Sequence, residues 1–172
     1  MWDLPIGKGR KVDVKNGFLN AFVGGWQTGA IWTVQTGFPQ TITIGGSDRS
    51  GAGGLFDRPN ATGISAYVDS PTPSRWYNPA AFALQPAGTF GNTGRNTAIG
   101  PGIFALDFSA HKEFQMPYSE RHALQFRFEG FNILNHPVWS SPNGNTQSTG
   151  FGTVTGTSIA MRQLQMALKY IF

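Results

Sequence analysis

Strict alternation of apolar and polar residues is the feature that most restricts what this chain can fold into. In the segment RQLQMALKYIF, residues 162–172, the even positions from 164 onward are all apolar and the odd positions are mostly polar. A period of two is typical of an extended strand with one apolar and one polar face. The segment is therefore predicted to be a β-strand whose apolar face meets either a protein core or a lipid bilayer.

Further segments alternate with the same parity: 25–38, 103–114 and 122–134, while MWDLPIG at the start is predicted to be the tail of a fifth strand. These strands are longer than the usual 5–6 residues or so and match the roughly 9–11 residues of a membrane-spanning strand. Lys112 interrupts the apolar row. The residues predicted to face lipid are Phe104, Leu106, Phe108, Leu124, Phe126, Phe128, Leu164, Met166 and Leu168.

The connections between these segments differ in length. The links 45–100 and 135–160 are long and rich in Gly, Pro, Asn, Ser and Thr, whereas 115–120 is short. The link from 7 to 20 is also short if part of 12–24 extends the next strand. Outer-membrane barrels have short periplasmic turns and long external loops. The predicted fold is all-β: an antiparallel meander of about four to five long strands, a segment of a large transmembrane β-barrel. In it 103–114 pairs with 121–133, and 162–172 lies beside them.

Composition favours a β-barrel over a helical membrane protein, a nucleic-acid-binding protein or a disulfide-linked fold. Charged residues make up 13% of the chain, about half the usual ~25%, and no apolar run of about 18 residues predicts a membrane helix. The basic residues are scattered except in GKGRK, residues 7–11, which indicates a basic turn and no nucleic-acid partner. The absence of cysteine excludes disulfides and thiolate metal sites. MWDLPIGKGR does not resemble a signal peptide, so export would require a longer precursor.

Candidate catalytic groups do not form a working arrangement. Asp107, Ser109 and His111 share one predicted strand face, but residues two apart on a strand are separated by about 7 Å, and a nucleophile needs its base within about 2.6–3.2 Å. They are interpreted as a polar row that lines a barrel lumen. His111 and His122 have opposite parity and are poorly placed to share a metal. We therefore expect no catalytic residue, no metal or cofactor site and no enzymatic activity.

Aromatic and loop residues provide two further hypotheses. Trp26, Phe114, Tyr118, Tyr170 and Phe172 are predicted to lie in an aromatic girdle at the periplasmic rim. The alternative is core packing in a soluble sandwich. In the long loops, the candidate contacts to an external ligand are Arg58, Trp76, Tyr77 and Arg95. Their alternative role is in folding the loops themselves.

The ordered series of motifs resembles a known family. It comprises GGWQTGAIWTVQTGFP, DRPN, RWYNPAAFALQPAGTFGNTGRNTAIGPG, LDFSAHKEF and ALQFRFEGFNILNHP, followed by the terminal aromatic strand. The series is similar to the C-terminal β-barrel region of TonB-dependent receptor-like outer-membrane proteins. The most similar subgroup is the Oar-like one, in which a carboxypeptidase-regulatory-like domain precedes the plug and barrel. The similarity covers essentially the whole chain.

The resemblance implies a barrel of about 22 strands, of which residues 1–172 would supply roughly the last five. It implies a location in the cell outer membrane, contact with outer-membrane lipid, and energised uptake or surface binding of a large solute. It also implies that Tyr170 and Phe172 form a signal for the barrel assembly machinery. The plug domain, the remaining barrel strands and the part that would contact TonB are absent from these residues.

Two other functional hypotheses remain at this point. One is a secreted β-sandwich that binds carbohydrate through Trp32, Trp76 and Trp139. The other is a truncated reading frame without function, because an open five-stranded sheet exposes edges that lipid does not tolerate.

Overall fold

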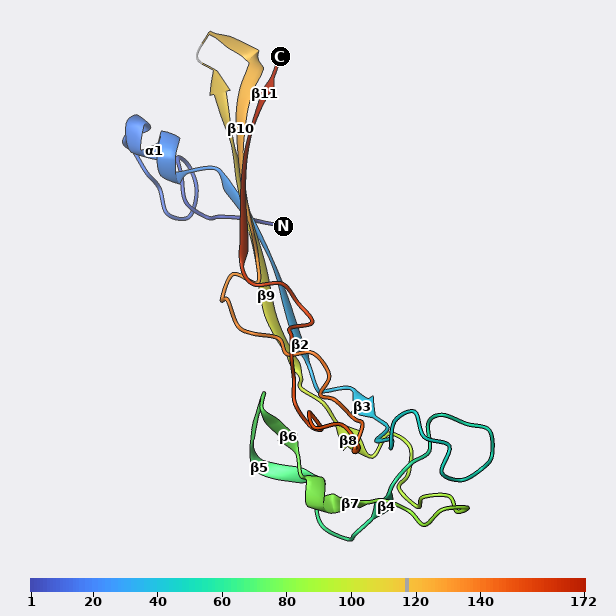
Figure 1. Ribbon diagram of the computed structural model, residues 1–172. Helices are drawn as coiled ribbons and strands as arrows, with labels where there is room; N and C mark the ends of the chain where they lie inside the picture. Colours follow the sequence, from blue (N-terminus) through green and yellow to red (C-terminus); the bar gives the residue numbers. More distant parts are fainter. Residues whose placement is uncertain (117) are drawn as a thin grey trace. The chain divides into compact units, whose positions relative to one another are not determined.

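The protein folds almost entirely as β-structure and irregular loops. The computed structural model describes residues 1–116 and 118–172, with 119 and 120 described in backbone only (Figure 1). The chain forms two compact units. Unit 1 comprises 1–33, 104–136 and 160–172, and unit 2 comprises 34–103 and 137–159.

A five-stranded sheet organises unit 1, in the order β1-β2-β9-β10-β11. The strands are β1 (Trp2–Asp3), β2 (Trp26–Gln35), β9 (Ile103–Met116), β10 (Ser119–Phe131) and β11 (Gln163–Ile171). β10 pairs antiparallel with β9 on one side and with β11 on the other. The predicted all-β meander is therefore confirmed, with strand ends within about three residues of those expected. The predicted short link 115–120 includes Pro117, which lies outside the described residues.

The link from 7 to 20 would be short only if part of 12–24 extended the following strand, and it does not. Residues Gly17–Val23 form the helix α1 instead. Asn16 caps its first turn, because the side-chain oxygen accepts hydrogen bonds from the backbone of Phe18 at 3.0 Å and Leu19 at 3.2 Å. Gly24 ends the helix, and its N–H donates to the carbonyl of Asn20. In the described part of the chain, no helix is long and apolar enough to cross a membrane.

Unit 2 contains most of the two long links, which the sequence presents as loops. Its short strands pair antiparallel: β3 (Pro39–Gln40) with β8 (Ala98–Ile99), β4 (Asn60–Ala61) with β7 (Phe82–Ala83), and β5 (Tyr67–Thr72) with β6 (Arg75–Tyr77). The short 3-10 helix η1 (Pro79–Ala81) precedes β7. The links therefore fold, although they contain no long strand.

The two links meet in a small core around Tyr77. Ile42, Tyr77 and Ala98 are fully buried. The ring of Phe151, from the second link, lies 6.1 Å from that of Tyr77. The N–H of Trp76 donates to the carbonyl of Gly152 at 2.8 Å. These contacts join residues that are far apart in the sequence, so the core depends on both links being present.

Candidate membrane-facing surface

The even-numbered residues of the three long strands form continuous rows on one face of the sheet. The strand register aligns Phe108, Gly130 and Leu164 in one row and Ala110, Phe128 and Met166 in the next. The third row is Lys112, Phe126 and Leu168, and the fourth is Phe114, Leu124 and Tyr170. Phe104 and Leu106 continue the same parity along β9. The structure thus brings all nine residues predicted to face lipid onto a single face.

Aromatic side chains cover this face along its length. Trp26 of β2 meets Phe126 edge to face, with ring centroids 5.9 Å apart, and Trp32 meets Phe104 in the same way at 5.8 Å. The apolar side chains of β11 are uncovered, since Leu164, Met166 and Leu168 are each 55–67% exposed. A water-soluble domain would bury such a face against a second layer. In the described residues, these side chains of β11 have no second layer over them.

Lys112 is the exception in this face, and the structure explains it. The residue is only 4% exposed, and its ammonium group donates hydrogen bonds to the carbonyl oxygens of Ala21, at 2.5 Å, and Gly24. Both carbonyls lie at the C-terminal end of α1, where the unpaired carbonyl groups and the helix dipole favour a cation. The ammonium also lies 4.9 Å from the ring centre of Phe114. The charge is therefore compensated locally.

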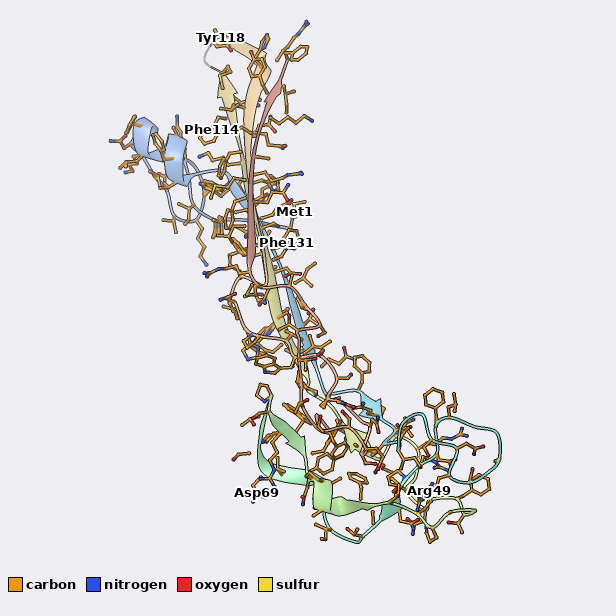
Figure 2. All side chains as sticks on the ribbon, viewed as in Figure 1. Met1, Arg49, Asp69, Phe114, Tyr118 and Phe131 are labelled. Atoms are coloured by element: carbon orange, nitrogen blue, oxygen red, sulfur yellow. The ribbon has the colours of Figure 1, made fainter. Side chains whose placement is uncertain are left out.

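A second aromatic cluster lies at the β9–β10 hairpin end, where Figure 2 labels Tyr118. The ring of Tyr170 stacks on His122 at 5.6 Å and on Phe172 at 6.2 Å. Its hydroxyl lies 3.0 Å from that of Tyr118 and 2.7 Å from Nδ1 of His122. Three of the five residues predicted to form a girdle meet here. Trp26 and Phe114 contact Lys112 instead. His122, which was not predicted to belong to the girdle, joins the cluster.

The odd-numbered residues give the opposite face a polar character. Register places Glu129 between Ser109 and Gln165, and Gln125 between Glu113 and Lys169. Asp107 accepts a hydrogen bond from the backbone of Asn132 at 2.8 Å, and Ser109 donates a long one of 3.5 Å to the carbonyl of Gly29. These bonds go to the backbone of neighbouring segments and do not link Asp107, Ser109 and His111 as a triad.

A shallow pocket of about 380 Å³ occupies part of unit 1. Met1, Gly29, Ile31, Asp107, Ser109 and Glu129 are among its lining residues. Figure 2 labels Met1 and Phe131, which both line it. Within the described residues, no three His, Asp or Glu side chains gather as a metal site would require.

The four loop residues considered as ligand contacts have different surroundings in unit 2. Tyr77 is 0% exposed, and its hydroxyl donates to Oε1 of Gln40 at 3.0 Å. The side chain of Tyr77 is therefore not accessible to a ligand and instead packs in the core of unit 2. The indole N–H of Trp76 donates to Ile99, and the Arg58 guanidinium donates to Thr93. Arg95 is exposed and remains available to a ligand.

Burial raises the pKa of Tyr77 to about 12, with a smaller contribution from Tyr67. The pKa of Asp48, in another loop, is shifted in the opposite direction. The backbone N–H of Gly53 donates a hydrogen bond to the Asp48 carboxylate and lowers its pKa. Ser50 and the backbone of Ala52 add to this effect. Both shifts arise from groups that fold the loops.

Comparison with known proteins adds an independent finding. Residues 1–165 match the family model described as "Outer membrane beta barrel domain". Searches of curated proteins and of solved structures each gave no match. The family match covers both long links and all of the sheet except the part of β11 after residue 165.

Proposed function

Because this chain belongs to the outer membrane β-barrel domain family, we propose that it forms part of the wall of a TonB-dependent receptor-like barrel. In this proposal the even-numbered face contacts lipid and the odd-numbered face lines the lumen. The observation that carries it is the register of β9, β10 and β11, which separates apolar and polar residues onto opposite faces. Lipid-facing and lumen-facing residues alternate in this way in membrane barrels.

The edges of the sheet support the proposal that further strands complete the barrel. Within the described residues, β11 pairs only with β10, and the pairing of β1 with β2 extends over two residue pairs. Unpaired strand edges are costly in lipid because the backbone groups have no water to bind. We expect the remaining barrel strands, with a plug domain, to come from outside residues 1–172. On this basis the chain is a C-terminal barrel part and TonB acts through another part of the protein.

The proposed activity is energised uptake, or surface binding, of a large solute. The barrel would gate the solute through conformational change and would not catalyse a reaction. Unit 2 would stand on the external side, where exposed residues such as Arg95 contact the solute. Tyr170 and Phe172 would act as a signal to the barrel assembly machinery. The carbohydrate-binding sandwich is less well supported, since β11 exposes the apolar residues that a sandwich would bury.

The uptake proposal can be tested in cells with and without the intact protein that carries these residues. Both strains are given fractionated growth medium, and solute depletion is followed with and without a protonophore. Depletion that needs both the protein and the proton motive force supports energised uptake. Solute that is retained at the surface without depletion supports a receptor. Equal depletion and equal retention by both strains would refute both functions.

A further inference from the structure

Helix α1 presents its apolar side away from the protein. Phe18 is 74% exposed and Phe22 is 59% exposed, and their rings lie 5.1 Å apart. Leu19 and Val23 are also exposed. Residues at these spacings occupy one side of a helix, and no residue of α1 is buried. This arrangement is the reverse of a helix in a water-soluble protein, whose apolar side packs on the core.

The C-terminal end of α1 fixes the helix to the sheet through polar bonds. Lys112 binds the carbonyl oxygens of Ala21 and Gly24, and the indole N–H of Trp26 donates to that of Phe22 at 2.8 Å. Lys112 and Trp26 belong to the even-numbered face. The helix is therefore attached on the apolar side of the sheet, near the hairpin end of β9, where Figure 2 labels Phe114.

A basic turn accompanies the helix. Lys8, Arg10, Lys11 and Lys15 are exposed, and residues 1–25 contain only Asp3 and Asp13 as acidic side chains. The backbone N–H of Lys8 donates to Oδ1 of Asn20 in the helix at 2.7 Å. A Cβ on Gly7 would lie 3.2 Å from Cα of Gly24, so the turn and the helix end pack closely. The turn and α1 thus form one element, which we call the rim element, residues 5–25.

We infer that the rim element seats on an anionic phospholipid surface at the hairpin end of the barrel. The inference rests on the proposed function, because it requires the even-numbered face to contact lipid. The apolar side of α1 would enter the boundary between headgroups and acyl chains, while the basic side chains reach lipid phosphates. Interfacial helices bind membranes through this combination of apolar area and basic charge.

Residues 1–172 contain no cysteine, so a cysteine introduced here is the only labelling site in this part of the protein. Phe18→Cys, Leu168→Cys and Gln125→Cys are made separately in the full protein, labelled with an environment-sensitive fluorophore and refolded into vesicles. The vesicles contain phosphatidylcholine alone or with phosphatidylglycerol, and doxyl-labelled lipids act as quenchers. We expect quenching at positions 18 and 168 to be several-fold greater than at 125. Quenching at 18 should be stronger with shallow than with deep quenchers.

Charge is tested by replacing Lys8, Arg10, Lys11 and Lys15 with Gln in the Phe18→Cys protein and, separately, in the Leu168→Cys protein. We expect quenching at position 18 on phosphatidylglycerol vesicles to fall to the level seen on phosphatidylcholine alone, while position 168 is unaffected. Quenching at 168 without quenching at 18 would overturn the rim inference and leave the barrel proposal intact. Equal quenching at 168 and 125 would overturn the barrel proposal itself. If the label at position 18 is not quenched by lipid and instead contacts the label of another protein copy, α1 binds a second copy, and the lipid surface is rejected.

Discussion

The ammonium group of Lys112 donates a 2.5 Å hydrogen bond to the carbonyl oxygen of Ala21, a residue 91 positions earlier in the chain. This bond joins the middle strand of the sheet to the last turn of α1. It explains how a charged residue can occupy an otherwise apolar row, because the helix end supplies the acceptors that the surroundings lack. It also makes the position of α1 sensitive to a single side chain.

Replacing Lys112 with Met should release α1 from the sheet. The variant loses a charged hydrogen-bond donor, a loss of about 1.5–3 kcal/mol in the free energy of unfolding. Trypsin cleavage of the vesicle-bound protein after Lys11 and Lys15 should become faster as the turn loosens. Lys169→Met on the odd-numbered face is the matched control and should leave cleavage unchanged. Equal cleavage rates in both variants would show that the bond does not hold the helix.

Replacing Phe126 with Arg should destabilise the barrel in lipid. If Phe126 lies near the bilayer midplane, the free energy of unfolding should fall by about 2–4 kcal/mol. Gln125→Arg, at the adjacent position on the opposite face, should cost far less because the lumen is hydrated. The measurement is reversible unfolding in lipid vesicles. Equal costs at the two positions would contradict the assignment of the faces.

Replacing Gly152 with Ala should loosen the core of unit 2. Gly152 has φ +71°, and an added Cβ would lie 3.1 Å from the backbone nitrogen of Tyr77. The left-handed conformation alone costs a non-glycine residue about 1–2 kcal/mol. Hydrogen exchange at the Trp76 amide, which donates to Gly152, should accelerate. Gly46→Ala is the control, since a Cβ there meets nothing within 4 Å, and equal exchange in both variants would refute the steric argument.

The stability of unit 2 should fall as the pH rises from about 10 to about 12. Tyr77 has a pKa of about 12 in the folded protein against 10.0 in its unperturbed state. The unfolded chain therefore releases the phenol proton first, so rising pH favours unfolding through this interval. Below pH 10 the contribution is fully present. Absorbance of tyrosinate at alkaline pH should show a late component that Tyr77→Phe removes. A late component that persists in that variant would assign the shift to another tyrosine.

The alternation of apolar and polar residues was sufficient to predict the long strands and their faces. Phe126 and Gln125 are adjacent, and extended backbone places them on opposite faces whatever lies around them. The meander of β9, β10 and β11 could also be predicted, because strands of matching parity and a short link favour antiparallel neighbours. The lipid contact of the even-numbered face, the TonB-dependent subclass and the assembly role of Phe172 stay predictions.

The helix was missed although the sequence carried its signals. Asn16 is a good N-cap, Phe18, Leu19, Phe22 and Val23 have helical spacing, and Gly24 can end a helix. Residues 12–24 were considered only as an extension of the strand that follows them. The helix is short, and a seven-residue helix is not stable by propensity alone. Its formation depends on the bonds from Trp26 and Lys112.

The sequence by itself determined the strands, their parity and the division between apolar and polar faces, because these follow from backbone geometry over a few residues. Only the tertiary structure decided the roles of Lys112 and Tyr77. Lys112 finds its acceptors 88 and 91 residues away, and Tyr77 is buried by contact with Phe151 of the other long link. Such contacts depend on how distant segments pack, and no period in the local sequence encodes them.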